Sequence, residues 1–123
     1  MAILLIAIGG GIGSVLRYLV GGFAQRAAGI GFPIGTLVVN VTGSLLIGAL
    51  SQHFMNTQTH PLARAALITG LCGGYTTFSA FSLETVGLIE GGEVGRAAAY
   101  VVLSVTVSIA ATFAGMAAVR ATT

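Results

Sequence analysis

The chain has 123 residues, of which 55% are hydrophobic and only 7% are charged, and its mean hydropathy is +0.99. About a quarter of the residues of a soluble domain are charged, so this composition excludes an ordinary soluble protein and indicates a membrane protein. The formal net charge of +2 is too small for a nucleic-acid-binding surface, and a single cysteine, Cys72, excludes an internal disulfide and a multi-cysteine metal site.

Four apolar segments follow one another, at residues 2–24, 33–51, 62–89 and 96–119. Each is close to the roughly 20 residues that a helix needs to cross the hydrocarbon core of a bilayer. Pro33 and Pro61 stand at the starts of the second and third segments, where a proline costs a helix little. We therefore predict an all-α membrane protein in which residues 1–123 form a single domain with four transmembrane helices.

The first segment combines small residues with one basic residue. Gly9 and Gly13 have the G-x-x-x-G spacing that permits two helices to approach closely. Arg17 is the one base inside a predicted span, and a snorkelling side chain near the end of the helix is the alternative to a functional role.

Polar residues recur at four-residue steps in the second and fourth segments. Thr36, Asn40 and Ser44 therefore share one face of the second helix. The fourth helix has a longer stripe of the same step, made of Tyr100, Ser104, Ser108 and Thr112. Either stripe could line a polar path, or its hydroxyls could bond to their own helix while Asn40 joins two helices.

The third segment is the longest and has the most polar centre. As one straight helix at about 1.5 Å per residue it would reach about 42 Å, whereas the hydrocarbon core is roughly 30 Å thick. Its centre contains Gly70, Gly73, Gly74, Thr76 and Thr77. A helix that is broken at its centre explains both the length and the composition. A continuous helix with glycines for close packing is the alternative.

Aromatic and acidic residues follow this centre at helical spacing. Thr77, Phe81 and Glu84 are separated by four and three residues, and Phe78 precedes Phe81 by three. Together with the other stripes, they offer hydroxyls, one amide and the partially positive edges of aromatic rings. Such neutral donors suit a small anion, because they replace its water without holding it too tightly to leave.

The arginines give no preferred orientation. With four spans, Arg64 and Arg120 flank the helices on one side of the membrane, and Arg26 and Arg96 flank them on the other. Without an excess of positive charge on either side, a chain can insert in both directions. An antiparallel homodimer is therefore a hypothesis that the sequence supports.

Three motifs together resemble those of the fluoride channels of the CrcB/Fluc family. They are GGGIGSVLRY at residues 9–18, GTLVVNVTGSLLIG at 35–48 and GLCGGYTTFSAFS at 70–82. The resemblance extends over essentially the whole chain. It implies a dual-topology antiparallel homodimer with two fluoride pathways, each lined by both subunits, in the inner membrane of a bacterium.

The resemblance also implies roles for individual residues. The backbone carbonyls of Gly73 and Thr76 of both chains would hold a sodium ion at the dimer centre, and Arg17 would lie near an aqueous vestibule. The fluoride pathway would consist of a pore amide, a hydroxyl near the break, two phenylalanine rings and a polar track: Asn40, Thr77, Phe78, Phe81, Tyr100, Ser104 and Ser108.

The function that follows from the resemblance is the passive export of cytoplasmic fluoride through a selective channel. The alternative is a small proton-coupled multidrug or guanidinium exporter, which needs an acidic residue in its first span. The first span here has no acidic residue and carries Arg17. No catalytic grouping of side chains stands out, so we expect no enzymatic activity.

Overall fold

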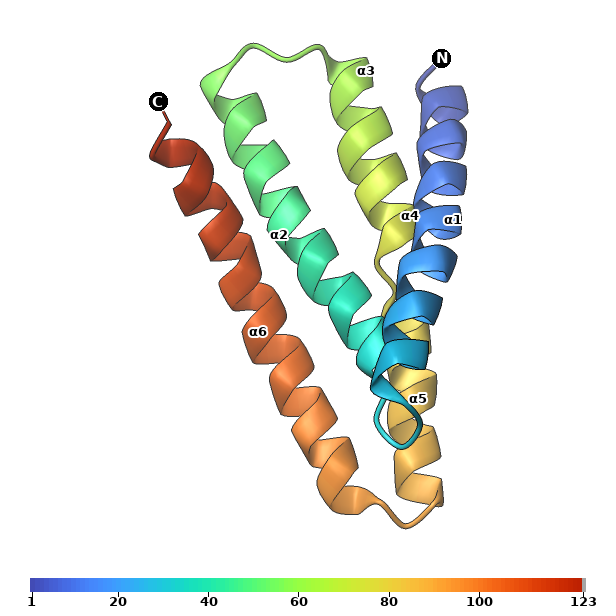
Figure 1. Cartoon of the computed structure of the whole chain (residues 1–123). Coiled ribbons are helices and arrows are strands. Elements are labelled where there is room, and N and C mark those ends of the chain that lie inside the picture. The colour runs from blue at the N-terminus through green and yellow to red at the C-terminus, as the bar shows by residue number, and fades with distance from the viewer. Residues whose placement is uncertain (123) are drawn as a thin grey trace.

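The computed structural model describes residues 1–122, and all the regular structure within them is helical (Figure 1). This confirms the predicted all-α class. The elements in chain order are α1 (Ala2–Ala28), α2 (Ile34–Asn56), α3 (Pro61–Arg64), the π-helix η1 (Ala65–Cys72), α4 (Gly73–Tyr75), α5 (Phe78–Glu90) and α6 (Val94–Arg120).

Three of the described helices, α1, α2 and α6, are long and apolar enough to cross a membrane. They correspond to the first, second and fourth predicted segments, but α1 and α2 continue further, to Ala28 and Asn56. The extensions contain polar residues such as Gln25 and Gln52, which form helices readily although they are not apolar. The apolar pattern therefore identified these helices and underestimated their lengths.

The third predicted segment is divided into shorter pieces. The chain runs through α3, η1 and α4 without interruption, and it then passes through Thr76 and Thr77 before α5 begins. Thr76 has φ −82° and ψ 157°, and Thr77 has φ −150° and ψ 116°, so both residues are extended. The side chain of Thr77 accepts a hydrogen bond from Ala80 N and caps the start of α5.

The long elements run up and down (Figure 1). Both termini and the connection from α2 to α3 lie at one end of the molecule, whereas the connections from α1 to α2 and from α5 to α6 lie at the other. Along the bundle, α2 packs chiefly against α6, and α1 packs chiefly against η1. Residues 70–80 therefore lie near the middle of the molecule, between the two ends.

Glycines form the two main helix contacts. A Cβ atom on Gly13 would overlap the carbonyl oxygen of Leu71 and would lie 2.8 Å from Tyr75 N, so only glycine permits this approach of α1. This confirms the close packing that was predicted for Gly9 and Gly13, both of which are buried. Gly48 and Gly115 permit the close contact between α2 and α6 in the same way, although no helical spacing in the sequence indicated their role.

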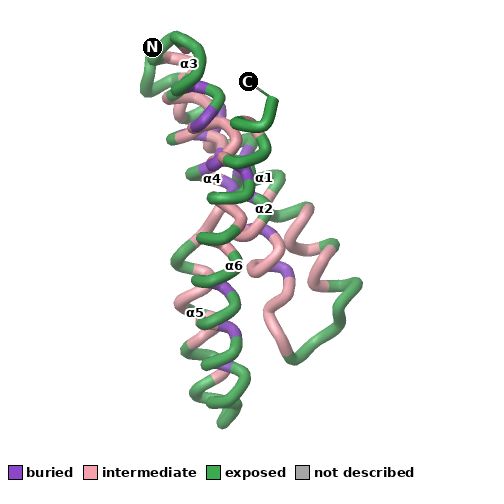
Figure 2. Tube along the Cα trace, turned by 90° about the vertical axis from the view of Figure 1, so that its left-hand side faces the viewer, coloured by how far each residue is buried: buried purple, intermediate pink, exposed green. Residues whose placement is uncertain are grey.

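The molecule buries few large side chains, and its surface is apolar. Exposed and half-buried residues dominate the trace along its whole length (Figure 2). The apolar side chains that are buried are Val39, Phe54, Cys72, Tyr75, Ala97 and Tyr100. So large an apolar surface is stable only in contact with lipid or with another protein. The chain is therefore a multi-pass helical membrane protein.

Candidate functional site

A groove passes alongside the two extended residues Thr76 and Thr77, and we term it the polar groove after the hydroxyl and amide side chains that occur in its mostly apolar lining. It has a volume of about 430 Å³ and is partly open, and residues of α2, η1, α5 and α6 line it. The predicted pathway residues that line it are Asn40, Thr77, Phe78, Phe81, Ser104 and Ser108. Gly73 and Thr76 line the same groove. The fold thus brings residues from four separate segments of the sequence to one surface.

Two hydroxyl groups in the polar groove have no hydrogen-bond partner among the described residues. These are Ser104 Oγ and Ser108 Oγ, and both atoms are buried. Thr112, in the same stripe of α6, instead donates to the carbonyls of Ser44, at 3.1 Å, and Ser108, at 3.3 Å. Bonding to helix backbone, the structural alternative for this stripe, therefore applies to Thr112 and not to the two serines.

Two phenylalanines that line the polar groove, Phe78 and Phe81, belong to an aromatic cluster. The ring centroids of Phe78 and Phe81 are 5.5 Å apart, and those of Phe81 and Tyr100 are 5.1 Å apart. Phe78 remains 79% exposed. The ring of Phe32 meets the ring of Tyr100 edge-on, with 5.6 Å between the centroids. Phe32 was not predicted as part of the site, because it lies in a loop outside the predicted helices.

Asn40 bonds to the backbone of Thr77 with both ends of its side-chain amide. Its Nδ2 donates to the carbonyl of Thr77 at 3.1 Å, and its Oδ1 accepts from the amide of Thr77 at 2.8 Å. A side chain of α2 thus replaces helix hydrogen bonds that the extended backbone has lost. Asn40 was predicted as a pore amide, and the structure adds this backbone contact, which sequence spacing does not reveal.

Arg17 and Ser14 of α1 contact the chain just before the extended residues. Arg17 Nε donates to the carbonyl of Gly74 at 3.2 Å, and Ser14 Oγ donates to the same oxygen at 3.5 Å. Arg17 is the one base of α1 that lies well inside the apolar sequence, and its side chain bonds to the backbone carbonyl of Gly74.

A second hollow, which we term the basic pocket, lies beside Arg17. It has a volume of about 310 Å³, and its lining includes Arg17, Arg26, Thr36, Thr77 and Glu84. Thr77 also lines the polar groove, so the two hollows meet at this residue.

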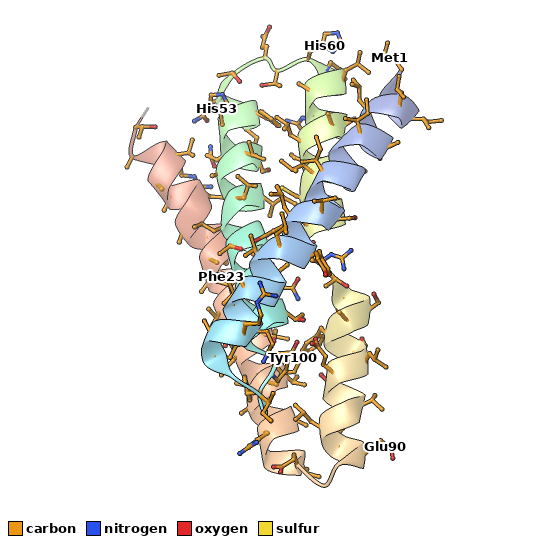
Figure 3. All side chains as sticks on the ribbon, turned by 45° about the vertical axis from the view of Figure 1, so that its right-hand side comes forward. Met1, Phe23, His53, His60, Glu90 and Tyr100 are labelled. Carbon is orange, nitrogen blue, oxygen red and sulfur yellow. The ribbon has the colours of Figure 1, made fainter. Side chains whose placement is uncertain are left out.

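Tyr100 connects α6 to the acidic residue of the basic pocket. The fully buried Tyr100 donates its hydroxyl to Glu84 Oε1 at 3.1 Å. Glu84 therefore bonds to Tyr100, whereas Arg17 bonds to the carbonyl of Gly74. Among residues 1–122, the ion pair is the one between Arg96 and Glu93, at 3.6 Å. Figure 3 shows Tyr100 in the half of the bundle nearer Glu90, whereas His53, His60 and Met1 lie at the opposite end.

These features define a small multi-pass helical membrane protein with a donor-lined groove inside an apolar bundle. The family described as CrcB-like protein, Camphor Resistance (CrcB), matches residues 4–116, and the chain belongs to this family. The membership confirms the resemblance that the three motifs indicated.

Curated relatives match over nearly their full lengths. The fluoride-specific ion channel FluC of Rhizobium meliloti (strain 1021) is 54% identical over 120 residues, which are 97% of this chain and 96% of that protein. The fluoride-specific ion channel FluC of Agrobacterium fabrum is 52% identical over 116 residues, 94% of this chain and 93% of that protein. FluC 1 of Nitrobacter hamburgensis is 53% identical over 119 residues, 96% of this chain and 94% of that protein.

Proposed function

We propose that the protein is a fluoride-selective ion channel that carries fluoride passively out of the bacterial cytoplasm across the inner membrane. Membership of the CrcB family and the relatives named as fluoride-specific ion channels support this function. The structural observation that carries it is the pair of buried hydroxyls in the polar groove, Ser104 Oγ and Ser108 Oγ, which have no partner within residues 1–122. Buried polar groups normally have partners, so these two donors are available to a passing anion.

The groove offers fluoride neutral donors in place of water. Ser104 and Ser108 supply hydroxyls, Phe78 and Phe81 supply ring edges, and Asn40 has a second N–H on the nitrogen that bonds to Thr77. Fluoride is small and costly to dehydrate, and closely spaced donors compensate this cost better than they do for the larger chloride. Because no full positive charge lines the groove, the ion can also leave it.

The basic pocket serves as the vestibule in this proposal. Arg17 and Arg26 give it a positive potential that raises the local concentration of anions. Fluoride enters cells as the neutral acid and dissociates at near-neutral internal pH. The negative-inside membrane potential then drives the anion outward through an open path.

The proposed assembly is a dual-topology antiparallel homodimer with four spans in each subunit. The elements from α3 to α5 form the third span, with the break at Thr76 and Thr77. The polar groove is partly open and Phe78 is exposed, so a second subunit would close the pathway. Arg26 and Arg96 lie at one end of the helices and Arg64 and Arg120 at the other, which favours neither orientation.

A sodium ion at the dimer centre is also part of the proposal, because the backbone at the break suits a hard cation. Gly73 and Thr76 line the groove, and the regular helix is interrupted next to them, so their carbonyls are the candidate ligands. Carbonyl oxygens are ligands that such cations prefer. When bound, the ion would neutralise the partial negative charge of these oxygens and join the two subunits.

Ion flux from liposomes tests the proposed function. Purified protein is reconstituted into liposomes loaded with potassium fluoride or potassium chloride, and the external anion is recorded after valinomycin is added. We expect rapid release of fluoride and little release of chloride. If correctly assembled dimers release neither anion, the channel proposal is wrong. A proton-coupled cation exporter would be tested next, although α1 contains no Asp or Glu.

A further inference from the structure

The break between α4 and α5 changes the partners of several backbone carbonyls. In a continuous α-helix, each carbonyl accepts from the amide four residues further on. Cys72 keeps this arrangement, since its carbonyl accepts from Thr76 N at 3.0 Å. The corresponding donors for Gly73, Gly74 and Thr76 would be the amides of Thr77, Phe78 and Ala80.

The amide that would bond to Gly73 is diverted by Asn40. Thr77 N donates to Asn40 Oδ1 at 2.8 Å, and Asn40 Nδ2 holds the carbonyl of the same residue at 3.1 Å. The two bonds fix the peptide groups on both sides of Thr77 in an extended conformation. Asn40 therefore keeps Thr77 N away from the carbonyl of Gly73.

The amide that would bond to Thr76 is diverted by the neighbouring side chain. Ala80 N donates to Thr77 Oγ1 at 3.1 Å, as expected of a residue that caps the N-terminus of a helix. Thr76 itself is extended, so its carbonyl does not continue the direction of the carbonyls in α5. Because Thr77 Oγ1 accepts from Ala80 N, this amide does not donate to the carbonyl of Thr76.

The carbonyl of Gly74, unlike those of Gly73 and Thr76, accepts hydrogen bonds from side chains of α1. Its oxygen accepts from Arg17 Nε and Ser14 Oγ, so α1 replaces the donor that the break removed. Gly73 and Thr76 line the polar groove, whereas the carbonyl of Gly74 faces side chains of α1. The carbonyls at the break therefore fall into two groups. Side chains of α1 donate to the carbonyl of Gly74, whereas side chains divert the amide donors of Gly73 and Thr76, the two residues that line the groove.

We infer that Asn40 and Thr77 are positioning residues of the cation site, since their side chains divert the two amides and make the carbonyls of Gly73 and Thr76 available. This inference rests on the sodium ion in the proposed function and deepens it. The resemblance assigned both residues to the fluoride pathway alone. The geometry gives each a second role, in which it acts on sodium through the backbone and not as a ligand.

Sodium-dependent thermal stability of the purified dimer tests the inference. The unfolding midpoint is measured against sodium chloride concentration, with N-methylglucamine chloride keeping the ionic strength constant. A ligand that binds only the folded state raises the midpoint, and the concentration for half the effect reports the affinity. Thr77→Ser keeps the capping oxygen, whereas Thr77→Val keeps the shape and removes it. Asn40→Leu removes both amide contacts, and Thr106→Val is a matched control whose hydroxyl bonds only to Val102 on α6.

We expect the wild-type midpoint to rise with sodium, and Thr77→Ser and Thr106→Val to show the same half-maximal sodium concentration. Thr77→Val and Asn40→Leu should raise that concentration tenfold or more. If Asn40→Leu does not fold, the Thr77→Ser and Thr77→Val pair decides. An unchanged half-maximal concentration in Thr77→Val, even with a lower midpoint, would show that the cap only stabilises α5 and would overturn the inference.

Fluoride flux of the same wild-type sample separates the two proposals. If the protein conducts fluoride but its midpoint does not respond to sodium, the positioning roles are rejected and the channel stands. If the midpoint responds to sodium but no fluoride is released, the channel is rejected, and the Thr77→Ser and Thr77→Val variants still decide the positioning roles.

Discussion

Ser104 and Ser108 occupy positions that folding alone does not favour. A buried hydroxyl without a partner costs about 1–3 kcal/mol, and both side-chain oxygens are in this state among the described residues. The neighbouring Thr112 shows that a hydroxyl on α6 can find backbone acceptors. The two serines are therefore explained better by the proposed fluoride pathway than by helix packing.

Replacement of Ser108 by alanine should separate these two effects. We expect Ser108→Ala to leave the thermal midpoint unchanged or to raise it, because an unpaired polar group is removed. Fluoride flux should fall by about fivefold or more, the equivalent of one lost hydrogen bond of about 1 kcal/mol. Both quantities are measured on the same reconstituted protein. Thr106→Val, which changes a hydroxyl outside the polar groove, should leave the flux unchanged.

Arg17 combines a charge in the basic pocket with a bond to the carbonyl of Gly74. Lysine keeps the charge but lacks the Nε–H that donates to this carbonyl. We expect Arg17→Lys to lower the stability by about 1.5–3 kcal/mol, the usual range for a hydrogen bond to a charged group, and to retain more flux than Arg17→Gln. Thermal unfolding and fluoride flux at low and high ionic strength are the measurements. Equal flux in the two variants would argue against an electrostatic role.

At the scale of elements, the contact of α1 with η1 and α4 holds the first part of the broken segment in place. The approach is close because Gly13 faces backbone atoms of Leu71 and Tyr75. The same contact brings Ser14 and Arg17 to Gly74. Since η1 is a π-helix, a rare form that occurs often at functional sites, α1 also supports the least regular part of the chain.

Two substitutions on α1 should differ sharply in effect. Gly13→Ala introduces a methyl group that overlaps the Leu71 carbonyl, so we expect separation of α1 from η1 and loss of the folded dimer. Gly11→Ala meets nothing within 4 Å and should be neutral or stabilising by about 0.5–1 kcal/mol. Size-exclusion chromatography in detergent and thermal unfolding measure both results. A stable Gly13→Ala dimer would contradict the packing described for this helix pair.

At the scale of the whole molecule, a single chain leaves the polar groove partly open. Phe78, which lines it, is 79% exposed. Lipid could cover the apolar helix faces, but lipid tails offer no partners to the groove's hydroxyls. The proposed antiparallel dimer places a second protein surface there and needs each chain to insert in both directions.

Labelling of one loop from one side of the membrane tests this orientation. Gln58 is exposed in the connection between α2 and α3, and Cys72 is buried and can be replaced by alanine. In a Cys72→Ala background, about half of the Gln58→Cys chains should react with a membrane-impermeant thiol reagent added outside cells. The remainder should react only after permeabilisation. Labelling of all chains, or of none, from outside would be evidence for a single orientation.

The sequence by itself determined the class of structure and the types of residue that line the groove. Apolar segments of membrane-spanning length and polar stripes at helical spacing are local properties, and the motifs identified the family. Which atoms meet was decided by the tertiary structure. Asn40 binds the backbone of Thr77, 37 residues away, and Arg17 binds Gly74, 57 residues away. Periodicity defines the face of one helix but does not define the distance and rotation between helices, on which these contacts depend.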